Sequence, residues 1–326
     1  MTLANQSDVR IAVLDDWQNA AAGSADWTAL KARAEVVFFD RPFASQDEAA
    51  QALAAFDIVL AMRERTPFPM TLVERLPRLR MFALTGSRGA LVDIAGMVKH
   101  GIVVCTTGTG PGAESTAEMA LALMLAIARD VPAGDAAARA GRFQQGTRAG
   151  MLLAGKTLGV MGLGNIGSRM AGYGRALGMK VQAWSQNMTA EAAQAAGATL
   201  CDKAQLLAGS DVVSLHLVLS DRTRGIVGRA ELTAMKPGAI LVNTSRAGLV
   251  DEAALTEAVQ GGRLFAALDV HHREPLPAGS PLAACRNTVL TPHYGYGTAE
   301  VFGDFYQQLV ENALAYLDGQ PIRTVA

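Results

Sequence analysis

The residues of this chain with the clearest chemical capacity are Arg246, Glu274 and His293, each of which follows a short apolar stretch in the second half of the sequence. An imidazole can donate and accept a proton near neutral pH, and a neighbouring carboxylate orients the ring and favours its charged form. A guanidinium can bind a carboxylate through two parallel hydrogen bonds. Together these residue types suit proton transfer on a small anionic molecule.

A glycine-rich segment upstream adds a second component. The pattern Gly162-Leu-Gly-Asn-Ile-Gly167 follows an apolar stretch and leads into a helical pattern at 165–177. In that context Gly162 permits a tight turn, Gly164 lets the backbone approach a pyrophosphate, and Gly167 allows helix and strand to pack closely. The pyrophosphate would lie at the first N–H groups of the helix, which include those of Asn165 and Ile166. We therefore expect a dinucleotide site that binds a nicotinamide cofactor.

The coenzyme preference stays open at this point. In such folds the next strand usually ends in an acid that binds the ribose 2′-hydroxyl, but here the stretch 181–184 runs into Ser185. An acid would repel a 2′-phosphate, so its absence makes NADP(H) admissible. No arginine stands beside Ser185 to bind that phosphate, however. NAD(H), NADP(H) and dual use all remain open.

The elements that must position these residues are short apolar runs separated by helical patterns, as in parallel sheets covered on both faces. The first series of expected strands covers 9–14, 36–39, 58–62 and 79–84. The second covers 158–161, 181–184, 212–215, 240–242, 265–268 and 289–290. Between the two series, a stretch rich in chain-breaking residues at 105–115 predicts an interdomain crossing, and an apolar helix is expected at about 116–130.

The composition and charge of the chain exclude several classes of function. The 326 residues carry a formal net charge of −1, which suggests neither a nucleic-acid nor an anionic-membrane partner. Neither the three cysteines nor the histidines have metal-ligand spacing, so no metal is expected. No apolar run reaches the ~20 residues of a membrane span, and the first ten residues have no targeting signature. We expect a cytoplasmic protein.

Each chemical residue also has a structural alternative. Arg246 could be a surface arginine paired with Asp251 or Glu252, and Glu274 could be a turn residue before proline. A lone histidine is more often structural than catalytic. Convergence of three complementary side chains on strand ends beside a nicotinamide loop favours the chemical interpretation. Of the other histidines, His216 is expected to line the cofactor pocket or cap a strand. His271 and His272 could border the substrate, but solvent exposure is expected for both.

Four motifs in this order resemble the D-isomer-specific 2-hydroxyacid dehydrogenases. They are the glycine loop, Asn243-Thr-Ser-Arg-Ala-Gly-Leu-Val-Asp251, Leu268-Asp-Val with Glu274-Pro-Leu-Pro277, and Asn287-Thr-Val-Leu-Thr-Pro-His293. The resemblance implies an α/β fold in which a Rossmann-type doubly wound parallel sheet domain is inserted into a smaller flavodoxin-like α/β domain. The NAD(P)-binding domain would cover 110–296, and the substrate domain 1–109 plus 297–326. The resemblance also implies a homodimer packed through the 116–130 helix region.

The resemblance further implies hydride transfer between a nicotinamide and a small 2-keto or D-2-hydroxy acid. Arg246 would anchor the substrate, His293 would be the acid/base, and Glu274 would be its partner. The cofactor pocket would also include Ser185, His216, Thr244 and Asp269. The substrate carboxylate would be held by the segment Thr85, Gly86, Ser87 and Arg88.

The substrate itself stays open. Family members often have Gly-x-Gly-x-Asp-Asn in the substrate loop, whereas this chain has Gly86-Ser-Arg-Gly89, so Arg88 would favour a second polar or anionic group. Phe68, Tyr294 and Tyr296 favour larger apolar substrates instead. Two alternatives for the function also remain, namely a dinucleotide-sensing regulator on the same fold and a dehydrogenase for a substrate without a carboxylate.

Overall fold

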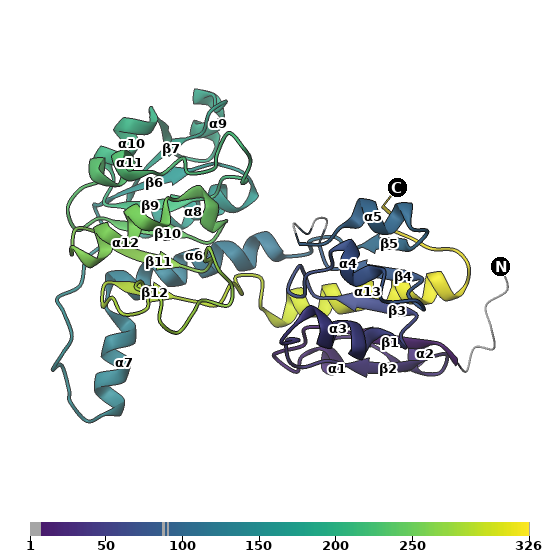
Figure 1. Cartoon of the computed structure of the whole chain (residues 1–326). Helices are drawn as coiled ribbons and strands as arrows, with labels where there is room; N and C mark the ends of the chain where they lie inside the picture. Colours follow the sequence, from purple (N-terminus) through teal and green to yellow (C-terminus); the bar gives the residue numbers. More distant parts are fainter. Residues whose placement is uncertain (1–7, 87–88, 90, 326) are drawn as a thin grey trace. The chain divides into compact units, whose positions relative to one another are not determined.

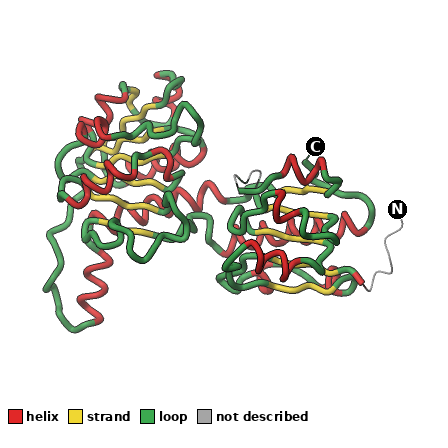
Figure 2. The backbone as a smooth tube through the Cα atoms, viewed as in Figure 1, coloured by secondary structure: helices red, strands yellow, loops and turns green. Residues whose placement is uncertain are grey.

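The computed structural model describes residues 8–86, 89 and 91–325. The chain divides into two compact units. Unit 1 comprises the described residues up to Pro111 together with those from Gly297 onward, and unit 2 is Gly112–Tyr296. Figures 1 and 2 show that each unit is built from a sheet with helices on its faces. The assignment of a substrate role to unit 1 and a cofactor role to unit 2 remains a prediction.

Unit 1 contains a five-stranded parallel sheet with the order β2-β1-β3-β4-β5. This order is that of flavodoxin-like folds, which confirms the fold expected for the smaller domain. Every residue of β3 and β4 is buried, as expected for central strands covered on both faces. The strands are β1 (Arg10–Val13), β2 (Glu35–Phe38), β3 (Ile58–Ala61), β4 (Met81–Leu84) and β5 (Val103–Thr106).

Helices from distant parts of the sequence cover this sheet. On one face α3, α4 and α5 contribute Leu53, Leu72 and Met97 to a core that includes Phe82 of β4. The last helix, α13, packs against β4 and also against α1 and α2, and its Tyr306 is fully buried (Figure 1). The helices are α1 (Ala21–Ser24), α2 (Thr28–Lys31), α3 (Gln46–Leu53), α4 (Met70–Val73), α5 (Ile94–Lys99) and α13 (Ala299–Leu317).

Unit 2 contains a seven-stranded parallel sheet with the order β12-β11-β10-β9-β6-β7-β8. The strand order reverses between β6 and β9, which is the topological switch point of a Rossmann-type sheet. The doubly wound fold predicted for the larger domain is thus confirmed. The strands are β6 (Thr157–Met161), β7 (Lys180–Trp184), β8 (Thr199–Leu200), β9 (Val212–Leu215), β10 (Ile240–Asn243), β11 (Phe265–Leu268) and β12 (Thr288–Leu290).

The two faces of this sheet have separate cores. Residues of α6 and α8 form one core with Val160 and Val242, and residues of α10, α11 and α12 form the other with Leu215 and Leu241. The helices are α6 (Gly112–Ala128), α7 (Val131–Arg139), α8 (Asn165–Ala176), α9 (Ala190–Ala195), α10 (Lys203–Gly209), α11 (Arg229–Ala234) and α12 (Glu252–Gln260), with a short 3₁₀ turn at Ala247–Leu249.

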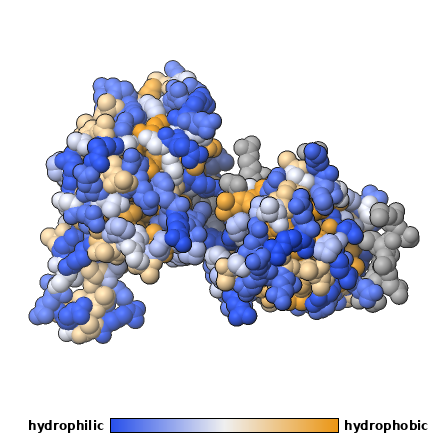
Figure 3. All heavy atoms as spheres, in the orientation of Figure 1, coloured by the Kyte–Doolittle hydropathy of each residue, from blue (hydrophilic) through white to orange (hydrophobic). Residues whose placement is uncertain are grey.

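The apolar helix differs from its expected bounds of about 116–130. It begins four residues earlier, at Gly112, and ends at Ala128, before Asp130, whose left-handed φ of 56° breaks the helical path. The chain then enters α7, a helix that the sequence pattern did not predict. Among the described residues, no helix is both long and apolar enough to cross a membrane. Figure 3 shows hydrophilic and hydrophobic residues interspersed over the visible surface.

Candidate active site

The glycine-rich loop follows β6 at the switch point of unit 2. Gly162 has a φ of 97°, a left-handed conformation that favours glycine, and an added Cβ would lie 2.7 Å from the carbonyl oxygen of His216. A Cβ on Gly167 would overlap the carbonyl oxygen of Gly162. Both positions therefore require glycine for reasons internal to the protein.

Gly164 is different, because a Cβ there would meet no atom within 4 Å. It is the N-cap residue of α8, and the cap has no side-chain hydrogen bond. The first turn of an α-helix has N–H groups without intrahelical partners, and its dipole attracts anions. This open cradle in front of Asn165 and Ile166 fits the pyrophosphate of a dinucleotide.

Further predicted cofactor residues lie at neighbouring strand ends. Ser185 follows β7, whose last residue, Trp184, accepts a hydrogen bond from the Gly162 N–H (2.8 Å). Two buried polar atoms, Thr244 Oγ1 and His216 Nδ1, have no protein partner in the described structure. Buried polar atoms of this kind are usually satisfied, so their presence here also fits a bound ligand.

The His216 ring has a fixed charge state. Its Nε2 lies 2.8 Å from Ser214 Oγ, and burial lowers its pKa to about 4. Burial disfavours the charged imidazolium, so the ring is neutral at pH 7. His216 is therefore suited to line a pocket rather than to act as an acid at neutral pH.

The acid and the imidazole are in direct contact in unit 2. Glu274 Oε2 lies 2.7 Å from His293 Nδ1. Burial raises the pKa of Glu274, but the hydrogen bond and charge of His293 and the N–H and charge of His271 outweigh this effect and hold the pKa below its usual value. The carboxylate thus stays ionised at neutral pH, and the stabilisation it gives is lost only as the pH falls through its lowered pKa. The carboxylate therefore faces Nδ1 of the His293 ring.

Asp269 holds the loop that carries His293. Its carboxylate is buried and accepts hydrogen bonds from the Thr291 hydroxyl (2.6 Å), the Tyr294 N–H (3.1 Å) and the Gly295 N–H (2.8 Å). His293 itself has a φ of 54°, which an L-residue rarely adopts. The network around Asp269 supports this conformation. The predicted contact of Asp269 with the nicotinamide stays a prediction.

Arg246 extends from a loop fixed by hydrogen bonds. The Asn243 side chain accepts from the Ser245 N–H (3.0 Å) and donates to the Arg246 carbonyl (3.0 Å). The guanidinium Nη1 donates to the Ser245 carbonyl oxygen (2.7 Å). Asp251, one of the two acids considered as a surface partner, caps α12 by accepting from the Ala254 N–H (2.9 Å). The strands β10, β11 and β12 are adjacent in the sheet. Each is followed by one of the three chemical residues, namely Arg246, Glu274 and His293 in this order.

The predicted substrate segment lies in unit 1, after β4. The Thr85 N–H donates to the Ala61 carbonyl (3.1 Å), and the Gly86 N–H donates to the Thr107 hydroxyl (2.8 Å). Both amides therefore already have acceptors within unit 1. Ser87 and Arg88 lie outside the described residues, and their substrate contacts remain predictions.

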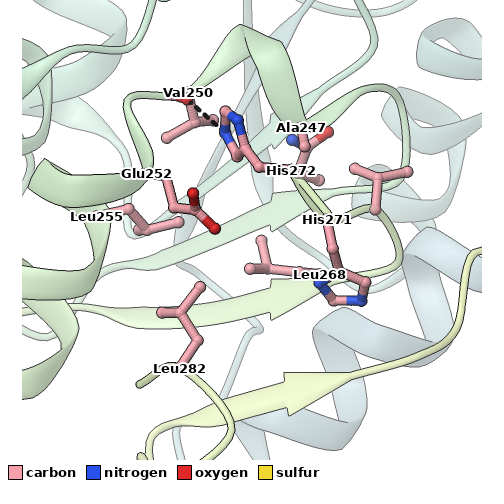
Figure 4. A pocket seen from close by; sticks show the side chains of 10 residues that line it. Ala247, Val250, Glu252, Leu255, Leu268, His271, His272 and Leu282 are labelled. Atoms are coloured by element: carbon pink, nitrogen blue, oxygen red, sulfur yellow. Dashed lines mark hydrogen bonds between the residues drawn. The ribbon is translucent and has the colours of Figure 1, made fainter. Parts of the chain in front are cut away.

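A pocket of about 20 Å³ lies beside the Arg246 loop, between β11 and α12 (Figure 4). It holds no more than about one water molecule, so it is too small for a keto acid. His271 is one of its lining residues. The expectation that His271 is solvent-exposed is wrong, because its ring is partly buried and bonded to Thr291. Among the described residues, no group of three His, Cys, Asp or Glu side chains could hold a metal ion.

A doubly wound sheet with a glycine loop at its switch point is the architecture of a dinucleotide-binding domain, and the acid–imidazole pair on neighbouring strand ends is suited to proton transfer. Residues 121–295 match the model of the "D-isomer specific 2-hydroxyacid dehydrogenase, NAD binding domain". The chain belongs to the D-isomer-specific 2-hydroxyacid dehydrogenase family. Its cofactor is accordingly a nicotinamide dinucleotide.

Individual proteins that are similar to this chain in sequence or structure are consistent with this assignment. A D-3-phosphoglycerate dehydrogenase of Archaeoglobus fulgidus is 35% identical over 86% of this chain and 53% of its own length. A glyoxylate reductase of Aeropyrum pernix is 39% identical over 76% of each chain. The crystal structure of a phosphoglycerate oxidoreductase of Vibrio cholerae has a TM-score of 0.90 and 34% identity, covering 95% of this chain and 99% of that one. The chain thus spans about half the length of its archaeal phosphoglycerate dehydrogenase relative.

Proposed function

We propose that this protein reduces a small 2-keto acid to the D-2-hydroxy acid, and catalyses the reverse oxidation, with Arg246, Glu274 and His293 as its chemical residues. The observation that carries the proposal is the 2.7 Å hydrogen bond between Glu274 and His293. It lies in the unit that also contains the dinucleotide loop. The regulatory alternative has no support from the relatives.

The roles follow from the chemistry of the three side chains. When bound, the nicotinamide cofactor supplies or accepts the hydride. His293 donates a proton from Nε2 to the carbonyl oxygen of the keto acid, and in the reverse direction it removes the hydroxyl proton. Glu274 keeps the ring oriented and stabilises the imidazolium. Arg246 binds the substrate carboxylate and polarises the ketone.

A substrate panel tests the proposal. Glyoxylate, hydroxypyruvate, pyruvate, phenylpyruvate and 2-ketoisocaproate are each assayed for reduction, and D-3-phosphoglycerate for oxidation. We expect turnover on at least one of them, with a D-configured product where the product is chiral. Tight NADH binding without turnover on any substrate would contradict the proposal and restore the regulatory alternative.

The same panel, run with both coenzymes, addresses the ribose pocket. Ser185 follows β7 where many relatives of this fold carry an acid that excludes a 2′-phosphate. We propose that both NADH and NADPH are accepted. A ratio of kcat/KM within about tenfold, equivalent to ~1.4 kcal/mol, would agree with this proposal. Exclusive use of one coenzyme would reject it.

We also propose that the chain forms a homodimer through α6 and the segment that follows it. One side of α6 is buried in the unit 2 core, while Glu118 and Ala122 on the other side are exposed. The following segment exposes Val131, Phe143 and Leu152, with Phe143 84% accessible. Apolar side chains exposed in one region often mark an interface. The cytoplasmic location inferred from the sequence stays a prediction.

A single substitution that introduces a negative charge into the proposed interface should dissociate the dimer. In the Phe143→Asp variant, a carboxylate would be buried without a partner, so we expect a monomer where the unaltered protein is a dimer. Multi-angle light scattering gives the mass directly. Arg142→Asp, at an exposed neighbouring position, is a control for the added negative charge. A dimer unaffected by Phe143→Asp would place the interface elsewhere.

A further inference from the structure

His271 connects the two loops that carry the acid–imidazole pair. Its backbone N–H donates to Glu274 Oε1 (2.9 Å), and its ring Nε2 lies 2.9 Å from the carbonyl oxygen of Thr291. Thr291 follows β12 and precedes His293 by two residues. One residue therefore joins the loop after β11, which presents the carboxylate, to the loop after β12, which presents the imidazole.

The surroundings of the His271 ring determine where its proton lies. A carbonyl oxygen only accepts hydrogen bonds, so the Nε2 that faces Thr291 carries a proton and donates it. The other nitrogen, Nδ1, is buried and has no hydrogen-bond partner among the described residues. The ring therefore acts as a hydrogen-bond donor to Thr291 through Nε2.

A hydrogen bond at this position can help to hold the backbone conformation of the loop that carries His293. His293 has the left-handed φ of 54°, a conformation that its surroundings must maintain. Asp269 holds the loop through Thr291, Tyr294 and Gly295. The hydrogen bond from His271 holds the same loop through a different atom of Thr291, its carbonyl oxygen, and ties it to the loop of Glu274.

The adjacent histidine makes a different contact. His272 Nε2 lies 3.1 Å from the carbonyl oxygen of Val250, in the segment before α12. Figure 4 shows the two rings pointing in different directions, with that of His272 turned toward Val250. Both rings face a backbone carbonyl, but only His271 is bonded to residues that support the pair. His272 is consequently a matched internal control.

We propose that His271 is a positioning residue, whose Nε2–H donation to Thr291 sets the geometry of the Glu274–His293 pair. The benefit to catalysis rests on the proposed function, whereas the geometry does not depend on turnover. Reacting groups displaced by about 1 Å can lose roughly 100-fold in rate. The loss of one tether should displace the pair by less than that.

Three variants test the proposal, with ¹⁵N-histidine NMR titration of the His293 ring and steady-state kinetics as readouts. His271→Phe keeps a ring but removes the donor, and His271→Gln places an amide N–H near the position of Nε2. His272→Phe is the control. We expect His271→Phe to lower kcat about tenfold and to move the His293 titration midpoint to lower pH, because a displaced Glu274 stabilises the imidazolium less. KM and the melting temperature should be nearly unchanged. His271→Gln should restore kcat to within about threefold, and His272→Phe should behave as the unaltered protein.

Several outcomes would overturn the proposal. An unchanged His293 titration and kcat in His271→Phe would show that the tether is dispensable. Equal losses in His271→Gln and His271→Phe would show that the donor is not what matters, and an equal loss in His272→Phe would indicate a general disturbance of the loop. If the unaltered protein turns over no keto acid, the proposed function fails, and the NMR titration still decides the role of His271.

Discussion

Replacing His293 with asparagine should lower kcat for keto-acid reduction about 1,000-fold, since general acid–base catalysis contributes roughly 10²–10⁴-fold. Asparagine is the informative choice because His293 has a φ of 54° and asparagine tolerates left-handed backbone better than most residues. The loop held by Asp269 should therefore keep its conformation, and only the proton donor is lost. Stopped-flow measurement of hydride transfer isolates this step from product release.

The control measurement is the affinity for NADH, which should change less than about twofold because the glycine loop is untouched. Glu274→Gln provides a graded comparison. It keeps an acceptor for Nδ1 but removes the negative charge that stabilises the imidazolium, so the decline of reduction at alkaline pH should move to lower pH. A His293→Asn enzyme that retains more than a tenth of the normal kcat would show that another group supplies the proton.

The Gly164→Ala variant should weaken NADH binding about 100-fold or more, which corresponds to ~2.7 kcal/mol, whereas the poorer N-cap should lower the stability of the protein by only about 1 kcal/mol. A Cβ at this position meets no protein atom within 4 Å, so the fold has no reason to change. The same Cβ would occupy the space through which the backbone approaches the pyrophosphate. Fluorescence titration with NADH and a thermal melt give the two quantities.

Gly172→Ala is the matched control for this substitution. Gly172 lies on the same helix, α8, and a Cβ there also meets no atom within 4 Å. Within a helix this change should stabilise the protein by up to ~1 kcal/mol, without an effect on NADH affinity. If Gly164→Ala binds NADH normally, the dinucleotide does not approach the N-terminus of α8 as proposed.

The sequence was sufficient for the fold because its signals are local. Apolar runs bounded by turn residues mark central strands such as β3 and β10, which are buried on both faces, and the glycine pattern marks the switch point. The strand β5 and the helix α7 were not predicted. Val103–Thr106 falls partly in a stretch rich in turn-forming residues, and α7 is short and begins at a valine and a proline. Their structures depend on tertiary packing that local propensity does not report.

The residue types of the site could be predicted from the sequence, but the hydrogen bonds that hold these residues in place could not. Glu274 and His293 stand out by their type and by the motifs around them, yet their support depends on contacts between separate loops. The three hydrogen bonds to Asp269 arise from the relative placement of β11 and β12. The contact of His271 with Thr291 joins residues 20 apart. A single sequence carries no signal for such pairings.

The path of the chain through the two units has a consequence for its synthesis. Unit 1 is built from the first part of the chain and from α13, with all of unit 2 between them. On the ribosome, the strands β1 to β5 emerge before unit 2, whereas α13, which packs against β4, emerges after it. Unit 2 is continuous and can fold as soon as it has been made. We therefore expect unit 2 to fold first, and the face of unit 1 that α13 covers to stay uncovered until α13 has been made.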